Sequence, residues 1–368
     1  MNGAARSRTV DVAFVAGGTG GHVYPAIAVA DALRGLDSSV TVAFAVDARA
    51  ASAEAVRRAG YEPEVLPISR GLQRGRTVAQ VLATIRSFVA LVRSFVRSVR
   101  WLRRTRPAAV VGFGAYVTVP VVLAARLLRI PVVVHEQNGV PGLANRLAVR
   151  LGARAATSVP GTPLREALLT GNPIRAQIVG VERRPQTPPL VAFVGASLGA
   201  QVLNDCALDL YDRWRDRVDI AVRLVSGADL HDACRARLDG LRSTDDRLDF
   251  ELVPYEHDMA GLYGRATLMV TRGGGTVMEL AAVGMPAIVV PWSGATEDHQ
   301  TANARAVAAA GGALHVPEPE CRADRVAAAI DELLSNPQRL TSMSAAMREF
   351  ARPDAAGALA RLVLEVAA

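Results

Sequence analysis

Short apolar segments alternate with helical patterns along most of this chain of 368 residues. Apolar runs of about four to eight residues between turn residues predict buried strands. The predicted strands are 9–16, 40–46, 108–112, 132–135, 155–159, 190–194, 220–226, 249–253, 268–271 and 287–291. Helical patterns such as 24–34, 117–128 and 300–310 lie between them. This alternation favours parallel sheets covered on both faces, so we expect two doubly wound α/β domains.

Turn residues indicate where one domain ends. Gly171, Asn172 and Pro173 close a stretch without a long hydrophobic period. We therefore expect an N-terminal domain over 1–170, a C-terminal domain over 171–352, and a last segment, 353–368, whose helix packs back on the N-terminal domain. Hydrophobic residues make up 50% of the chain, which is enough to give each domain a core.

Positive charge is concentrated in one segment. The net charge is +7, yet residues 65–135 contain twelve arginines and no acidic residue, so removing those twelve charges leaves −5. Such local basicity does not indicate a nucleic-acid partner. Within the segment, 76–106 predicts one long helix with an apolar stripe that includes Val89, Val92 and Val96. Two interpretations stay open: a core helix with solvated arginines, or a basic amphipathic surface that docks on an anionic membrane.

The cysteines and the lengths of the apolar runs indicate the cellular compartment in which we expect the protein. Cys206, Cys234 and Cys321 are far apart and lack metal-ligand spacing, which is typical of thiols in a reducing compartment. No apolar run matches a signal peptide or a membrane span. We expect a cytoplasmic protein without a bound metal.

Three glycine-rich turns directly follow predicted strands, at 17–21, 195–199 and 273–275. A glycine turn that opens a helix directs backbone N–H groups beyond the end of the strand, which suits a phosphate. A dinucleotide fingerprint that begins at Gly18 would need glycine in place of Val23, although Asp47 does follow the second strand. This weakens the dehydrogenase interpretation without excluding it. Glu279 is either an acid favoured by a helix dipole or a ligand for two ribose hydroxyls.

Several motifs occur in a fixed order between residues 10 and 315. They are 17–26 (GGTGGHVYPA), 112–116 (GFGAY), 135–138 (HEQN), 141–145 (PGLAN), 171–175 (GNPIR), 197–200 (SLGA), Asn204, 279–286 (ELAAVGMP) and 298–300 (DHQ). In this order they resemble the MurG family, the N-acetylglucosaminyltransferases of peptidoglycan synthesis. The resemblance implies a GT-B fold, two doubly wound domains that face each other across a cleft. It also implies inverting transfer of GlcNAc from UDP-GlcNAc to the C4 hydroxyl of MurNAc in undecaprenyl-pyrophosphoryl-MurNAc-pentapeptide, without a metal or other cofactor.

The resemblance further implies the residues of the site. The donor set is Thr19, Gly20, Gly21, Asn138, Arg175, Ser197, Glu256, Gly274, Gly275, Thr276, Glu279 and Gln300. The acceptor set is Gly18, His22, Tyr116, His135 and Asn204. In the donor set, Glu279 matches the ribose-binding acid, Gln300 a sugar contact, and the backbone of Glu256 a uracil contact. The expected partners are both substrates, an anionic membrane surface and cell-wall synthesis proteins, at the cytoplasmic face of the cell membrane.

An inverting transfer needs a base for the incoming hydroxyl group. His22, at the lip of the first glycine turn, is the first candidate, because an imidazole titrates near neutral pH. The same position also suits a residue that orders the turn or binds the acceptor pyrophosphate. Glu136 and His135 are alternative bases. Another glycosyltransferase with this fold, or a UDP-GlcNAc 2-epimerase, is the alternative function.

Overall fold

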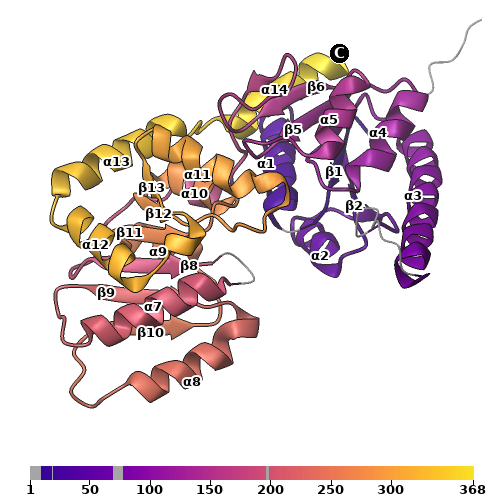
Figure 1. Cartoon of the computed structure of the whole chain (residues 1–368). Coiled ribbons are helices and arrows are strands. Elements are labelled where there is room, and N and C mark those ends of the chain that lie inside the picture. Colours follow the sequence, from indigo (N-terminus) through magenta and orange to yellow (C-terminus); the bar gives the residue numbers. More distant parts are fainter. Residues whose placement is uncertain (1–9, 19, 69–77, 196–198) are drawn as a thin grey trace, which may run out of the picture. The chain divides into compact units, whose positions relative to one another are not determined.

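The computed structural model of the chain describes residues 10–18, 20–68, 78–195 and 199–368. The chain divides into two compact units, Met1–Arg175 with Asp354–Ala368, and Ala176–Pro353. Each unit is built around one parallel sheet with helices packed against it (Figure 1). The break between the units follows Arg175, whereas the turn residues predict a break after residue 170.

The first unit contains a sheet with the strand order β3-β2-β1-β4-β5-β6-β7, in which every neighbouring pair is parallel. Its strands are β1 (Val12–Ala16), β2 (Val42–Val46), β3 (Pro63–Val65), β4 (Ala109–Gly112), β5 (Val132–Glu136), β6 (Arg154–Thr157) and β7 (Leu168–Leu169). Its helices are α1 (Gly20–Leu36), α2 (Ala50–Arg58), α3 (Val78–Thr105), α4 (Thr118–Leu127), α5 (Leu143–Arg150) and α14 (Ala355–Ala367). Because β1 lies between β2 and β4, the strand order reverses there, and the turns after β1 and β4 meet at the carboxyl edge of the sheet.

The core of the first unit explains why its strands are apolar at successive positions. Both faces of the sheet are covered, so neither face accepts polar side chains. Strand β1 is fully buried, and Phe14 stacks on Phe44 with ring centroids 5.2 Å apart. Helix α14 adds Leu359 and Val363 to the same core and packs beside α1 (Figure 1). The last helix of the chain is therefore part of the first unit.

Helix α3 does not bury the stripe of valines that a core helix requires. The exposed apolar residues in its described part are Phe88, Val89, Val92 and Val96. The buried face contains Trp101 and Leu102 with two serines, Ser94 and Ser98. Ser98 satisfies its hydroxyl by donating a hydrogen bond of 2.6 Å to the carbonyl of Ser94. Helix α3 packs against α4, and the valines lie on its exposed side.

The second unit contains a sheet with the strand order β10-β9-β8-β11-β12-β13, again parallel throughout. Its strands are β8 (Leu190–Val194), β9 (Ala221–Val225), β10 (Asp249–Val253), β11 (Leu268–Thr271), β12 (Ala287–Val289) and β13 (Ala313–His315). Its α-helices are α6 (Ala176–Val179), α7 (Gln201–Trp214), α8 (His231–Leu241), α9 (Met259–Arg265), α10 (Thr276–Val283), α11 (His299–Ala309), α12 (Ala323–Leu334) and α13 (Pro337–Phe350). Three 3-10 turns add η1 (Ala228–Leu230), η2 (Thr296–Asp298) and η3 (Glu318–Glu320). The strand order reverses between β8 and β11, so the turns after these strands are neighbours.

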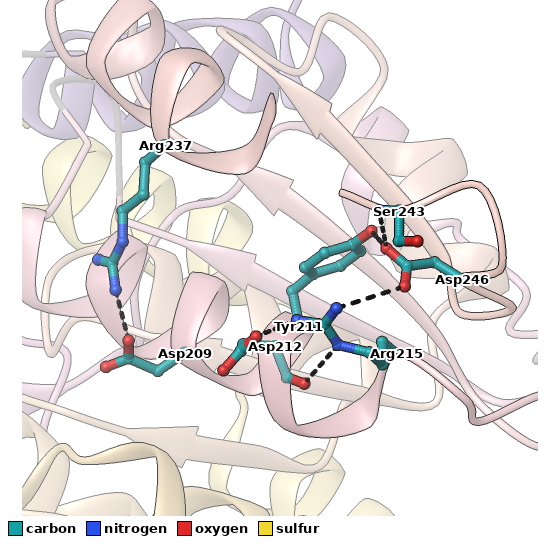
Figure 2. Close-up of polar contacts among 7 residues, drawn as sticks. All are labelled: Asp209, Tyr211, Asp212, Arg215, Arg237, Ser243 and Asp246. Atoms are coloured by element: carbon teal, nitrogen blue, oxygen red, sulfur yellow. Dashed lines mark hydrogen bonds and ion pairs between the residues drawn. The ribbon is translucent and has the colours of Figure 1, made fainter. Parts of the chain in front are cut away.

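A polar network at the end of α7 stabilises the amino edge of the second sheet (Figure 2). Asp246, in the segment before β10, accepts hydrogen bonds from the Tyr211 hydroxyl and, at 2.8 Å, from the amide of Ser243. Arg215 pairs with Asp212 and Asp246. The hydrogen bond from Tyr211 and that from the Ser243 amide hold the pKa of Asp246 below its usual range. Because this network precedes the strands, it lies on the edge opposite to the glycine turns and contributes to stability.

All ten predicted strands are present within a few residues of their expected bounds, which confirms the doubly wound α/β fold. The structure adds β3, β7 and β13, and each of these lies at the edge of its sheet. Edge strands are covered less completely and are often short, so they need no apolar run. Strand β3, with the sequence PEV, illustrates why the hydrophobic pattern misses them.

Candidate functional site

Asp47 fixes the first glycine turn. Its carboxylate lies just after β2, where Oδ2 accepts a hydrogen bond of 2.7 Å from the amide of Gly18. The Ser52 hydroxyl donates to the carbonyl of Gly18 at 3.3 Å. In a dinucleotide site, the acid after the second strand binds a ribose. Here that acid binds the backbone of the chain's own turn, which argues against the dehydrogenase interpretation.

His22 lies between two turns of the first unit. It stands near the start of α1, and its ring lies beside Gly18 and Gly114. Gly114 and Ala115 both have positive φ, 78° and 57°, and this conformation costs alanine free energy. Thr118 holds the turn by donating a hydrogen bond to the carbonyl of Gly114. The turns after β1 and β4 thus enclose the imidazole that the sequence predicts as the base.

His135 is a buried, neutral histidine that ties β5 to the end of the first unit. Its Nε2 lies 2.9 Å from the carbonyl oxygen of Gly171 and 3.2 Å from Ser158 Oγ. Because a carbonyl only accepts, Nε2 carries the ring proton. Burial lowers the pKa of His135 to about 4, and nearby His22 acts in the same direction, whereas the Gly171 carbonyl opposes the shift. The side chain is 0% exposed, which suits a positioning residue better than a direct contact with an acceptor. The predicted acceptor contact stays a prediction.

Glu136 organises the loop after β5. Its Oε1 accepts hydrogen bonds from the backbone and side-chain nitrogens of Asn138, at 3.0 and 3.3 Å. Its Oε2 accepts from the Gly142 amide at 2.9 Å and from the Asn145 side chain at 2.8 Å. A carboxylate with four such bonds suits a positioning residue better than a base. Its catalytic role stays a prediction.

Other predicted residues of the first unit follow its central strands. They are Gly20, Gly21, Tyr116 and Asn138, which come after β1, β4 and β5. Arg175 is the last residue of this part of the unit, and its guanidinium lies 4.7 Å from the ring centroid of Tyr24 on α1. This cation–π contact orients the arginine. Thr19 lies outside the described residues.

The third glycine turn, in the second unit, packs against α11. A Cβ on Gly273 would lie 2.3 Å from the carbonyl oxygen of Gln300, so only glycine fits there. The buried side chain of Asn303 donates a hydrogen bond of 2.9 Å to the carbonyl of Gly273. Residues 274–275 face open space, and Thr276 begins α10. The structure therefore brings an open turn and a helix start next to Gln300, an arrangement that suits a phosphate.

Glu279 lies beside this turn, in the first turn of α10. The hydroxyl of Tyr263, on α9, donates a hydrogen bond of 2.7 Å to its Oε2. Because Tyr263 is fully buried, it fixes the orientation of the carboxylate. The acid therefore does more than complement the helix dipole.

Glu256 shapes the loop that leads into α9. Its carboxylate accepts a hydrogen bond of 3.0 Å from the Asp258 amide and pairs with Arg223 at 2.8 Å. Asp258 in turn caps α9 by accepting from the Gly261 amide at 2.8 Å. Within the described residues, no hydrogen bond uses the backbone amide or carbonyl of Glu256. These groups are available for the predicted uracil contact, which stays a prediction.

Asn204 holds the region of the second glycine turn from inside the core. Its side chain is 0% exposed and donates a hydrogen bond of 2.9 Å to the carbonyl of Ser226, just after β9. This buried position suits a residue that holds a loop better than one that contacts an acceptor, and the predicted acceptor contact stays a prediction. Ser197, in the turn itself, lies outside the described residues.

Arg272 and Glu318 form a buried ion pair that orders the loop after β12, and this pair was not predicted from the sequence. Arg272 lies 2.6 Å from Glu318 and donates to the carbonyl of Val290 at 3.3 Å. Glu318 also accepts a hydrogen bond of 2.9 Å from the amide of Ser293. Burial raises the pKa of Glu318, but the hydrogen bonds from Ser293 and Arg272 outweigh burial and lower it overall. The two partners are far apart in the sequence, so no local pattern indicates the pair.

Both units place glycine turns where the strand order reverses, which is where doubly wound sheets bind ligands. Two such units are the architecture of the GT-B class, and an oriented acid beside an open glycine turn suits a nucleotide sugar. Residues 12–157 match the glycosyltransferase family 28 N-terminal domain, and residues 190–359 match the glycosyltransferase family 28 C-terminal domain. The chain belongs to glycosyltransferase family 28.

Similar proteins support this assignment over the full length. A UDP-N-acetylglucosamine–N-acetylmuramyl-(pentapeptide) pyrophosphoryl-undecaprenol N-acetylglucosamine transferase from Alkalilimnicola ehrlichii is 40% identical and covers 98% of this chain and 99% of its own. The protein of the same name from Halorhodospira halophila is 39% identical, and the match covers 97% of this chain and 98% of that protein. The crystal structure of Acinetobacter baumannii MurG matches with a TM-score of 0.76 and 29% identity, over 96% of this chain and 99% of that one. These relatives confirm the predicted resemblance to the MurG family.

A UDP-GlcNAc 2-epimerase from Neisseria meningitidis has the same fold. Its structure matches with a TM-score of 0.69 over 97% of this chain and 100% of its own, at 15% identity. This likeness concerns the fold alone.

We expect His135 to make the folded chain less stable in acid. An unfolded histidine has a pKa of about 6.5, whereas burial lowers the pKa of His135 to about 4. Between these values the unfolded chain binds a proton that the folded chain does not, so stability falls as the pH falls. This group should remove about 2 kcal/mol of unfolding free energy between pH 7 and pH 5, measured by denaturant unfolding.

The variant His135→Gln keeps a donor for the Gly171 carbonyl but does not titrate. Its unfolding free energy should fall by about 2 kcal/mol less than that of the wild type between the two pH values. The exposed His257 provides the control, since His257→Gln should keep the wild-type pH dependence. The same pH dependence in His135→Gln and the wild type would contradict the account of His135.

Proposed function

We propose that this chain transfers N-acetylglucosamine from UDP-GlcNAc to the C4 hydroxyl of MurNAc in undecaprenyl-pyrophosphoryl-MurNAc-pentapeptide, a step of peptidoglycan synthesis. Full-length similarity to transferases named for these substrates supports the proposal. The structural observation that carries it is the carboxylate of Glu279, which Tyr263 orients beside an open glycine turn. Such a carboxylate can accept hydrogen bonds from both hydroxyls of a ribose while the turn faces the phosphates.

Each part of UDP-GlcNAc has a proposed contact in the second unit. The uracil pairs with the backbone of Glu256, the ribose with Glu279, and the pyrophosphate with Ser197 and residues 274–276. The sugar contacts Gln300, whose backbone lies against the third turn. The N–H groups at the start of α10 stabilise the negative charge that grows on UDP as it leaves. In this proposal the protein, without a metal, stabilises the leaving group.

The first unit provides the remaining proposed contacts. Those for the donor are Thr19, Gly20, Gly21, Asn138 and Arg175, and those for the acceptor are Gly18, His22 and Tyr116. Stacking on Tyr24 preorganises the guanidinium of Arg175 for a phosphate. The buried residues His135 and Asn204 act as positioning residues for this site instead of contacting a substrate.

The proposed reaction is a single in-line displacement. The C4 oxygen of MurNAc forms a bond to C1 of GlcNAc as the bond between C1 and the β-phosphate oxygen of UDP breaks. The configuration at C1 inverts, and the hydroxyl proton moves to a base. We propose His22 as that base, because its ring lies between the turns after β1 and β4.

UDP release from UDP-GlcNAc, with and without the lipid-linked acceptor, tests the reaction. We expect release to require the acceptor, and conversion of the donor without acceptor would contradict the proposal in favour of an epimerase.

In the same assay His22→Ala should lower kcat about 100-fold or more and leave the Kd for UDP-GlcNAc within about 2-fold. A loss confined to the acceptor KM would show that His22 binds the acceptor and is not the base.

Glu279 allows a direct test of donor binding. Glu279→Ala should weaken UDP binding about 10-fold or more, because a charge-assisted pair of hydrogen bonds is lost. Calorimetric titration with UDP measures this loss. Glu279→Gln should retain the hydrogen bond from Tyr263 and bind UDP with intermediate affinity. The exposed Glu332, on α12, supplies the control Glu332→Ala. Unchanged UDP affinity in Glu279→Gln and Glu279→Ala would refute the ribose contact.

A lipid-linked acceptor requires the protein to reach a bilayer. No helix in the described part of the chain is long and apolar enough to span one. Helix α3 offers a docking surface, because its exposed Val92 and Val96 border a groove of about 640 Å³. The arginines of this groove are Arg93, Arg97, Arg100 and Arg104. We propose that the α3 surface binds anionic lipids at the cytoplasmic face of the membrane, with apolar insertion and charge acting together.

Charge reversal on α3 tests this docking surface. Arg97 and Arg104 pair with Glu64, at 2.5 and 2.9 Å, whereas no ion pair among the described residues includes Arg93 or Arg100. The double variant Arg93→Glu/Arg100→Glu should therefore weaken binding to vesicles containing phosphatidylglycerol at least about 10-fold. Wild-type binding should weaken as salt rises.

Sedimentation with vesicles measures this binding. The double variant Arg213→Glu/Arg247→Glu, at two exposed arginines of the second unit, is the charge-matched control. Equal binding of the wild type to vesicles of phosphatidylcholine alone would remove the electrostatic part of the proposal. Binding to neither kind of vesicle would remove the docking surface altogether.

A further inference from the structure

The exposed indole of Trp292 occupies a position that no proposed contact uses. Trp292 lies in the loop after β12 and is 50% exposed, although tryptophan is usually largely buried. The two other tryptophans of the chain, Trp101 and Trp214, are 3% and 4% exposed. An apolar ring of this size in water, on a residue whose backbone is hydrogen-bonded to Gln300, needs an explanation.

The loop after β12 holds this indole in a defined place. The amide of Trp292 donates a hydrogen bond of 2.9 Å to Oε1 of Gln300. The amide of the next residue, Ser293, donates to Glu318 at 2.9 Å, and Glu318 belongs to the buried ion pair described above. One side of the indole packs on Gly294, where a Cβ would lie 2.8 Å from ring atoms Cε2 and Cζ2. The backbone that carries the indole is therefore held by side chains, and one side of the ring is supported by Gly294.

We infer that Trp292 binds the sugar ring of the donor, as an aromatic platform for the apolar face of an N-acetylhexosamine. This inference rests on the proposed function, in which Gln300 contacts that sugar. A pyranose ring presents C–H groups on one face, and such groups pack favourably on an aromatic ring. Because the backbone of this loop is already held, the contact costs less conformational entropy than one made by a free loop.

The surroundings of Trp292 favour the sugar over the nucleoside. Its amide is bonded to Gln300, the proposed sugar contact. The proposed nucleoside contacts, Glu256 and Glu279, are instead joined through α9, which Asp258 caps and which carries Tyr263. The indole should therefore contact UDP-GlcNAc through its sugar and should not contact UDP.

Quenching of tryptophan fluorescence by acrylamide tests this contact without relying on catalysis. Trp292 is the accessible indole, so it should dominate the quenching, and Trp292→Phe should abolish that component. Saturating UDP-GlcNAc should lower the quenching constant about 2-fold or more, whereas UDP should leave it unchanged. Protection by UDP alone would assign the ring to the nucleotide and overturn the inference. Protection by the lipid-linked acceptor alone would assign it to the acceptor sugar and also overturn it.

Affinity provides the second measurement. Trp292→Ala should raise the Kd for UDP-GlcNAc roughly 3- to 10-fold and leave the Kd for UDP within about 2-fold, while Trp292→Phe keeps most of the affinity. Val218→Ala, at another exposed apolar residue of the second unit, is the control. If UDP-GlcNAc binds but neither shields Trp292 nor loses affinity in Trp292→Ala, the inference fails alone. If UDP-GlcNAc does not bind the wild type, the proposed function fails with it.

Discussion

The loops at the carboxyl edges of both sheets are held by polar side chains that are themselves buried. The side chains that do this are Asp47 and Glu136 in the first unit, and Asn204 and Asn303 in the second. Strands covered on both faces contribute almost no polar side chains, and an unpaired buried backbone group costs about 1–3 kcal/mol. Each of these residues therefore satisfies a turn that would otherwise destabilise the sheet edge. The proposed chemistry depends on this constraint, because it fixes the turns before a substrate binds.

A site fixed in this way suits a reaction in which charge moves from one group to another. The N–H groups of a fixed turn stabilise charge on leaving UDP without first reorganising, so they act most strongly in the transition state. In the same way, Tyr263 fixes the orientation of Glu279 by a hydrogen bond, and the ring of Tyr24 orients Arg175. His135 is neutral because it is buried, whereas His22 is half-buried between the turns after β1 and β4.

The sequence predicted most of the fold, because strands covered on both faces leave continuous apolar runs. It missed β3, β7 and β13, which are edge strands and need no such run. It identified Glu279 and Gln300 by motif, and the structure brings both to the third glycine turn. It did not show that His135 and Asn204 are fully buried, because burial depends on contacts between distant segments. The pair Arg272–Glu318 could not be predicted either, because its two residues are far apart in the sequence.

A crystal structure of the chain with UDP-GlcNAc tests the central claim most directly, since that claim locates the donor at the carboxyl edge of the second sheet. The account predicts both ribose hydroxyls within hydrogen-bonding distance of the Glu279 carboxylate and the pyrophosphate at the start of α10. It also predicts the uracil at the backbone of Glu256 and the sugar beside Gln300. A nucleotide bound with its ribose away from Glu279, or on the first glycine turn instead of the third, would contradict it.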